Sequence, residues 1–164
     1  MKTTSIILAA GQGTRMKSDL PKILHPVCGK PMVWHALQTA RVVSKETPVM
    51  IVGHGADGVR DTISSAARFV VQAERLGTGH AVQQAESTLK GNTDLVLVSA
   101  ADMPLLSGET LSKLVKTQKA NTGPMTMLTI FAEDQRGFGR IMRGGDDGVR
   151  AIVEEADCTE EQKA

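Results

Sequence analysis

The strongest constraint on the fold is a short apolar run at residues 5–10 that leads directly into a glycine-rich loop at residues 11–16. The run SIILAA has the length and apolar character of a buried strand. A glycine-rich turn that leaves such a strand exposes backbone N–H groups, and these groups bind phosphate. Arg15 and Lys22 add full positive charges to the same loop. The sequence therefore predicts an anion site for a phosphorylated small molecule; the alternative is a tight strand-to-helix turn with incidental charges.

Two well-known phosphate loops nearly match this segment, and both fail at Met16. The dinucleotide-binding pattern GxGxxG begins with Gly11 and Gly13 but needs a third glycine where Met16 stands. The P-loop pattern GxxxxGK[ST] begins at Gly11 and ends at Lys17–Ser18, and it also needs a glycine in place of Met16. A side chain there would crowd a backbone wrapped around phosphate, so the sequence argues against both classes.

Short apolar runs alternate with helix-like patterns along most of the chain. The runs that predict strands are 5–10, 48–52, 68–71, 94–99 and 125–131. The patterns that predict helices are 31–43, 57–67, 78–89 and 107–119, with Pro31 at a first helical position and Ser107 as an N-cap. This order is typical of an α/β fold with a mainly parallel sheet and helices on both faces. Ligands of such sheets bind beyond the carboxyl ends of the strands, where residues 11–22, 72–79 and Asp102 are expected to converge.

The pattern changes after residue 131. Residues 137–143 and 149–154 flank a glycine-rich turn and predict a β-hairpin near the C-terminus. Thr159 and Gln162 match a capping box at the start of a helix. Since no linker, repeat or low-complexity tract interrupts the chain, we expect residues 1–164 to form one domain. The last helix begins just before the sequence stops, so we expect this domain to be incomplete at its C-terminus.

Composition excludes several classes of protein. With a formal net charge of +1, three Phe, one Trp and no Tyr, the chain has neither the charge nor the stacking residues of a nucleic-acid binder. Cys28 and Cys158 form no CxxC pair and are interpreted as free thiols of a reducing compartment. No apolar run approaches the roughly 18 residues of a membrane helix. We therefore expect a cytoplasmic protein that binds neither membrane nor nucleic acid.

Blocks spread over nearly the whole chain resemble one enzyme family. They begin with LAAGQGTRMKSDLPK at residues 8–22 and continue through His25 and residues 29–32, 52–57, 72–81, 101–106, 137–141 and 152–155. In these blocks, and in their order, the chain resembles the nucleotide-sugar pyrophosphorylases, and among them the bacterial N-acetylglucosamine-1-phosphate uridyltransferases. The resemblance implies a Rossmann-like, three-layer nucleotidyltransferase fold. It also implies transfer of UMP from UTP to N-acetylglucosamine 1-phosphate, giving pyrophosphate and UDP-N-acetylglucosamine for peptidoglycan and lipopolysaccharide precursors.

Such a reaction needs charge neutralisation rather than a general base, because the attacking phosphate oxygen is already ionised. We assign Arg15 to the triphosphate and the leaving pyrophosphate, and Lys22 to the transferred phosphate. The alternative for Lys22 is a solvated loop lysine. By the resemblance, the residues that hold the nucleotide in this loop are Leu8, Ala9, Ala10, Gly11, Gly13, Thr14 and Lys22.

Asp102 follows an apolar strand at the edge where the ligand is expected. A carboxylate in this position is a natural hard ligand for Mg²⁺, which prefers carboxylate and phosphate oxygens. The alternative is a turn or capping aspartate before Pro104. The resemblance implies that Asp102 binds the Mg²⁺ cofactor.

Gln72 and the turn that follows it suit a pyrimidine edge, because an amide offers both a donor and an acceptor and glycines allow close approach. The alternative is a plain strand-to-helix link with Thr78 as N-cap. The resemblance implies that Gln72, Gly77 and Thr78 contact uracil. It further implies that Gly139 and Glu154 hold the amino sugar.

The chain departs from the family's pattern in three places. Ala101 stands where the family usually has glycine, and Glu155–Ala156 replaces a more basic pair. The sequence also stops before two asparagine-bearing segments and before the left-handed β-helix, which carries the family's acetyltransferase activity and much of its homotrimer contact. We therefore expect no acetyl transfer. The alternatives to uridylyl transfer are a sister sugar-phosphate nucleotidyltransferase and a truncated, non-catalytic nucleotide-sugar binding module.

Overall fold

The fold is described from a computed structural model of the chain. It covers residues 1–163 except 12, 14–15, 54–55, 75 and 146–147. The chain divides into two compact units, Met1–Met127 and Leu128–Ala164, and each is described by itself. That residues 1–164 make one domain stays a prediction.

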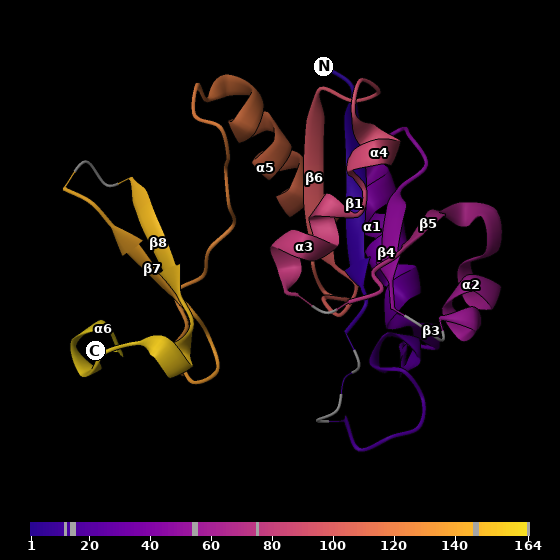
Figure 1. Cartoon of the computed structure of the whole chain (residues 1–164), viewed down its shortest axis with the longest axis horizontal. Coiled ribbons are helices and arrows are strands. Elements are labelled where there is room, and N and C mark those ends of the chain that lie inside the picture. Colours follow the sequence, from indigo (N-terminus) through magenta and orange to yellow (C-terminus); the bar gives the residue numbers. More distant parts are fainter. Residues whose placement is uncertain (12, 14–15, 54–55, 75, 146–147, 164) are drawn as a thin grey trace. The chain divides into compact units, whose positions relative to one another are not determined.

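The first unit is built on a parallel sheet, as the alternation of elements predicts (Figure 1). Its strands are β1 (Thr3–Ala9), β4 (Val49–Val52), β5 (Arg68–Val71) and β6 (Leu95–Ala100), in the order β5-β4-β1-β6. Ile6 of β1 lies opposite Val49 on one side and Val98 on the other, so β1 is a central strand. Burial on both faces explains why β1 and β4 are continuous apolar runs rather than alternating ones.

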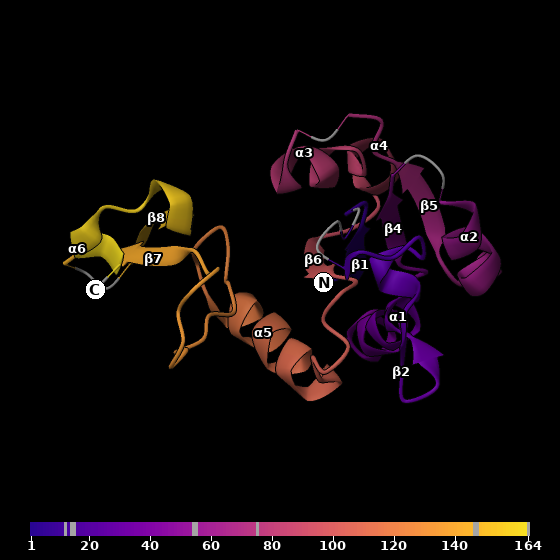
Figure 2. The same cartoon turned by 90° about the horizontal axis from the view of Figure 1, so that it is seen from below.

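Helices cover both faces of this sheet and form three layers (Figure 2). The helices are α1 (Met32–Val43), α2 (Asp57–Ile63), α3 (Thr78–Gln83), α4 (Glu86–Leu89) and α5 (Gly108–Ala120). Ile7 and Met50 belong to the core cluster shared with α1 and α2. Ile6 and Val49 point the other way, into the cluster with α3 and α4. Because successive side chains of a strand point to opposite faces of the sheet, each face has its own hydrophobic core.

Helix α5 packs closely against α1 in the first unit. A Cβ added to Gly108 would lie 2.8 Å from a methyl carbon of Val42. The Thr39 hydroxyl of α1 donates to the Leu106 carbonyl, at 3.1 Å, just before α5 begins. Ser107 is the N-cap of α5, as predicted, and its Oγ accepts from the Thr110 N–H at 3.1 Å.

Three predicted helices differ in detail from the observed ones. The helix predicted at 57–67 ends at Ile63, and a short 3-10 helix, η3 (Ser64–Ala66), follows it. Pro31 is the N-cap of α1, one residue before the helix, rather than its first residue. The predicted helix at 78–89 is two short helices, α3 and α4. Between them Ala85 N–H donates to the carbonyl of Val82, three residues back. This tighter turn accompanies complete burial of Ala85 against the sheet.

A small hairpin that the sequence analysis missed precedes α1. It pairs β2 (Pro26–Val27) with β3 (Lys30–Pro31). Cys28 and Gly29 both have positive φ, of 49° and 77°, which suits a two-residue hairpin turn. The signal was weak because cysteine, unlike asparagine or aspartate, is not a residue that predicts such a turn.

The predicted strand at residues 125–131 is wrong. The described residues contain no strand between Ala120 and Arg140. Met125 and Ile130 are about two-thirds exposed, at 68% and 66%. Residues of this kind favour a strand only where a neighbouring strand offers hydrogen bonds and a face to pack on. No described strand pairs with residues 125–131, so this run does not form a strand despite its apolar, β-favouring composition.

The second unit contains the predicted C-terminal hairpin. Strand β7 (Arg140–Arg143) pairs antiparallel with β8 (Val149–Val153), and η4 (Glu155–Asp157) and α6 (Glu160–Lys163) follow. The capping box is confirmed, because the Thr159 N–H donates to Gln162 Oε1 at 2.9 Å and the Gln162 N–H donates to Thr159 Oγ1 at 3.3 Å. Among the residues that the structure describes in either unit, no helix is long and apolar enough to cross a membrane.

Candidate functional site

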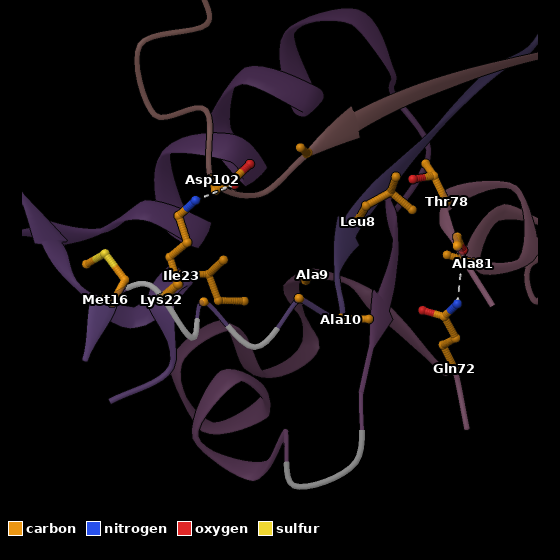
Figure 3. Close-up of a pocket in the computed structure, with 14 residues that line it drawn as sticks. Leu8, Ala9, Ala10, Met16, Lys22, Ile23, Gln72, Thr78, Ala81 and Asp102 are labelled. Carbon is orange, nitrogen blue, oxygen red and sulfur yellow. Dashed lines mark hydrogen bonds and ion pairs between the residues drawn. The ribbon is translucent and has the colours of Figure 1, made fainter. Parts of the chain in front are cut away.

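A cavity of about 580 Å³ opens at the carboxyl ends of the parallel strands of the first unit (Figure 3). Ten of the residues that the sequence analysis singles out line it together. They are Leu8, Ala9, Ala10, Gly11, Gly13, Lys22, Gln72, Gly77, Thr78 and Asp102. Segments that lie far apart in the sequence therefore converge at one edge of the sheet, where ligands of parallel sheets bind.

The cavity has two chemically different ends. Figure 3 shows Lys22 and Asp102 on one side and Gln72 and Thr78 on the other, with Ala9 and Ala10 between them. The first end carries charge, and the second carries an amide and a hydroxyl. An elongated ligand with an anionic group at one end and a polar ring at the other matches this arrangement.

Gly13 of the glycine-rich loop lies close to Lys22. Gly13 has a φ of +63°, and a Cβ added to it would clash with Cβ of Lys22. The Met16 N–H donates to the carbonyl of Gly13 at 2.8 Å and closes a turn within the loop. Gly13 is thus required both for its backbone conformation and for the close approach.

Lys22 and Asp102 form an ion pair inside the cavity. Lys22 Nζ donates to Asp102 Oδ2 at 2.7 Å, and the two side chains are 35% and 38% exposed. Lys22 begins η2 (Lys22–Leu24), directly after Pro21, and Asp102 follows the end of β6. The turn before Asp102 is anchored by Ala101, which is fully buried and whose N–H donates to the carbonyl of Leu8 at 2.9 Å.

The polar end is built around Gln72, which follows β5 and is only 5% exposed. Its Nε2 donates to the carbonyl of Gly77 at 3.2 Å and ties the turn to the strand. Gly77 is the N-cap of α3 and Thr78 is the first residue of that helix. Thr78 is therefore not the N-cap that the alternative of a plain strand-to-helix link assigned to it.

The other predicted site residues lie elsewhere. Thr14 and Arg15 lie outside the described residues, so their assignments stay predictions. Gly139 and Glu154 belong to the second unit, where they are neighbours: a Cβ added to Gly139 would lie 3.7 Å from Glu154 Oε2. The same Cβ would lie 3.3 Å from the Val153 carbonyl oxygen, so glycine permits close packing against β8 here. The sugar-binding role of Gly139 and Glu154 stays a prediction.

The cavity also contains residues that the sequence analysis missed. They are Met16, Ile23, Ala81 and Ala100. Ala81 lies one helical turn after Thr78 and Ala100 ends β6, so their positions in these elements could have identified them. Met16 gave no such signal, because it was judged only as a misfit to glycine-containing loops.

Only one carboxylate lines the cavity among the described residues, that of Asp102. The described residues also contain no group of three or more His, Cys, Asp or Glu side chains that could hold a metal by themselves. A cation that takes one carboxylate and completes its shell with water and ligand phosphate oxygens would fit this donor set. That is the coordination habit of Mg²⁺ rather than of zinc.

Known proteins resemble the chain in both sequence and fold. The bifunctional protein GlmU of an Exiguobacterium species is 46% identical over 164 residues, which are 100% of this chain and 36% of the relative. The chain therefore spans about a third of the length of the curated relatives it matches. It corresponds to their N-terminal part.

Solved structures share the fold at lower identity. A putative glucose-1-phosphate thymidylyltransferase from Bacillus anthracis has a TM-score of 0.74 and 21% identity, over 93% of this chain and 64% of that one. A UDP-glucose pyrophosphorylase complexed with UDP-glucose has a TM-score of 0.66 and 19% identity, over 98% of this chain and 71% of that one. These likenesses confirm the expected nucleotidyltransferase fold class.

The family model for the MobA-like NTP transferase domain matches residues 5–155. This match includes most of the first strand, the glycine-rich loop, every residue that lines the cavity and the C-terminal hairpin. The chain belongs to the MobA-like NTP transferase domain family.

Proposed function

We propose that this chain is the part of a pyrophosphorylase that transfers UMP from UTP to N-acetylglucosamine 1-phosphate, giving UDP-N-acetylglucosamine and pyrophosphate. The observation that carries the proposal is the cavity itself, which joins a glycine-rich loop, a lysine–aspartate pair and a buried amide at one sheet edge. The 46% identity to a GlmU relative over the whole chain supports it. The activity and its products are proposals, because the chain spans 36% of that relative.

The charged end of the cavity suits the phosphates. Lys22 supplies a fixed positive charge beside the position of the attacked phosphorus, where negative charge accumulates during transfer. Arg15 is assigned to the leaving pyrophosphate, and backbone N–H groups of residues 11–14 serve as further donors. No general base is required of the chain, since the attacking phosphate oxygen is ionised at neutral pH.

Asp102 is the proposed protein ligand of Mg²⁺. Bound there, the cation would neutralise phosphate charge and hold the triphosphate oxygens in place. Lys22 Nζ is now 2.7 Å from Asp102 Oδ2, so this carboxylate already attracts a cation in the folded chain. Lys22 would leave Asp102 for the transferred phosphate when the carboxylate binds the metal.

The polar end suits the base, with Gln72, Gly77 and Thr78 placed around it. In the second unit, Gly139 and Glu154 are proposed for the sugar, with close backbone approach at the glycine and a hydroxyl hydrogen bond to the carboxylate. A sister enzyme for another sugar phosphate would use the same charged end. The UDP-glucose bound in a solved neighbour supports a uridine nucleotide as the ligand, whether the sugar phosphate is N-acetylglucosamine 1-phosphate or another one.

The test is pyrophosphate release from UTP, Mg²⁺ and N-acetylglucosamine 1-phosphate by this chain. We expect release that requires the sugar phosphate. Glucose 1-phosphate and other triphosphates, supplied in parallel, distinguish a sister enzyme. Saturable binding of UDP-N-acetylglucosamine without any release would contradict the activity of this chain and support a binding module instead.

A matched pair of variants tests the metal assignment. Asp102→Asn removes the proposed ligand, and Asp94→Asn changes a carboxylate at the opposite end of the same strand, where Oδ2 accepts from the Lys2 N–H at 2.7 Å. We expect Asp102→Asn to lower release by at least about a hundredfold, because a metal ligand and its transition-state charge stabilisation are lost. Asp94→Asn should stay close to the unsubstituted chain. Equal rates in both variants would refute the assignment.

A further inference from the structure

His80 lies directly behind Gln72, outside the wall of the cavity. Gln72 Nε2 is 3.1 Å from His80 Nδ1 and 3.2 Å from the carbonyl oxygen of Gly77. Gln72 lines the cavity, and His80 does not. Both hydrogens of the Gln72 amide nitrogen are therefore directed at protein acceptors rather than at a ligand.

The two contacts determine which way the buried amide faces. A backbone carbonyl can only accept a hydrogen bond, so the Gln72 atom beside Gly77 is the nitrogen. With the nitrogen held there, Oε1 is the amide atom available to a ligand, and Figure 3 shows it on the side away from the hydrogen bond. At 5% exposure, Gln72 has little water to replace a lost partner, so a reversed amide would be costly.

The contact also determines the tautomer of His80. An amide N–H donates to Nδ1 only if Nδ1 carries no hydrogen, so the ring is neutral and its hydrogen is on Nε2. Gln84 Nε2 is 3.1 Å from His80 Nε2, and a neutral ring accepts at one nitrogen only. Gln84 Nε2 also donates to the His80 carbonyl at 3.2 Å, and turning this amide to accept from Nε2–H would give up that bond. Gln84 is half-buried, so water can replace the lost partner, whereas Gln72 is buried and held by Gly77.

We propose that His80 is a positioning residue that sets the base preference of the site through Gln72. His80 Nδ1 accepts a hydrogen bond from Gln72 Nε2, and this leaves Gln72 Oε1 facing the ligand as a hydrogen-bond acceptor. Such an acceptor recognises a base whose ring nitrogen carries a hydrogen. Uracil has such an N–H, whereas cytosine has an unprotonated acceptor nitrogen at the same place. The inference rests on the proposed function, since it concerns the base end of the same cavity.

Two variants separate positioning from packing. His80→Phe keeps a planar ring of similar size but removes the acceptor, and His80→Asn restores an acceptor oxygen near the position of Nδ1. Gln83→Ala is the matched control, since Gln83 is exposed on the same helix. Thermal unfolding of each variant reports any effect on the fold.

Calorimetric titration with UTP and with CTP measures the preference. We expect the unsubstituted chain and Gln83→Ala to bind UTP more tightly than CTP. His80→Phe should lower the ratio of UTP to CTP affinity by about tenfold or more, since one of the two acceptors that hold the buried Gln72 amide is lost and its second hydrogen is left without a partner. His80→Asn should recover most of that ratio. A His80→Phe variant that binds UTP with an unchanged ratio would overturn the proposal.

A measurement without nucleotide keeps this inference distinct from the proposed function. The side-chain amide resonances of Gln72, observed by ¹⁵N NMR, report the hydrogen bond to His80 directly. We expect them to move in His80→Phe and to stay near their original shifts in His80→Asn. If they move as expected but the unsubstituted chain binds no UTP, the proposed function fails and the positioning contact stands. Unmoved resonances in His80→Phe overturn the contact itself.

Discussion

Lys22 and Asp102 show how one contact joins two parts of the cavity that are 80 residues apart in the sequence. Their side chains are about a third exposed, so solvent screens the pair and its contribution to the stability of the fold is small. We therefore expect the Lys22–Asp102 ion pair to matter for ligand binding rather than for the stability of the fold. Both residues were predicted as site residues, but their pairing was not, because sequence separation carries no information about side-chain reach.

Gly13 is the residue that the geometry of the loop constrains most. We expect Gly13→Ala to destabilise the chain by about 1–3 kcal/mol, through a positive φ in a non-glycine residue and a clash with Lys22. Displacement of Lys22 should also weaken UTP binding. Urea unfolding followed by circular dichroism measures the first effect, and UTP titration measures the second.

Gly11 offers the matched control for this substitution. A Cβ added to Gly11 meets no atom within 4 Å, and its φ is not in the positive region. Gly11→Ala should therefore change the free energy of unfolding by no more than about 0.5 kcal/mol. Equal destabilisation by the two substitutions would mean that Gly13 does not lie close to Lys22 in solution.

Helices and strands were predicted correctly where the residues within the element determine its structure. Helix α1 ends at Val43, as predicted, and Ser107 is the N-cap of α5, as predicted. The run at 125–131 failed because a strand needs a partner, whereas a helix satisfies its own backbone. The break between α3 and α4 was missed for a related reason, since burial of Ala85 is a property of the packed helix and not of its sequence.

The cap of α5 gives a prediction at this scale. Ser107→Ala removes the acceptor for the Thr110 N–H, and we expect it to lower the free energy of unfolding by about 1 kcal/mol. Ser112→Ala is the control, because the Ser112 hydroxyl donates to the carbonyl of Gly108 inside the same helix, at 2.7 Å. This internal bond adds little to helix stability, so the control should change by less than about 0.5 kcal/mol. Denaturant unfolding compares the two, and a larger loss for Ser112→Ala would contradict the capping role.

At the scale of the whole molecule, the two units differ in how much of their strands is buried. Every residue of β4 is buried, and so are six of the seven residues of β1. Strand β8, in contrast, has four exposed residues and one of intermediate burial. Stability against local opening follows burial of this kind.

Amide hydrogen exchange measured by mass spectrometry tests this difference. Peptides that contain β1 and β4 should exchange slowest, close to the rate set by global unfolding. Peptides from residues 140–153 should exchange much faster, and exchange of the urea-unfolded chain supplies the reference for each peptide. Protection of β7 and β8 equal to that of β1 would contradict the prediction.

The sequence by itself determined the four strands of the parallel sheet and the positions of α1, α2 and α5, and together with the family resemblance it determined the fold class and ten residues of the cavity. The strands and helices follow from hydrophobic period and turn chemistry, which are local properties, whereas several of the cavity residues, among them Leu8, Ala9 and Ala10, follow from the resemblance. Only the tertiary structure decided that Lys22 reaches Asp102, that His80 contacts Gln72, and that residues 125–131 form no strand. Each of these features depends on a residue or strand that is distant in the sequence. The free energy of such a contact is set by how the chain packs in three dimensions, not by the residues adjacent in the sequence.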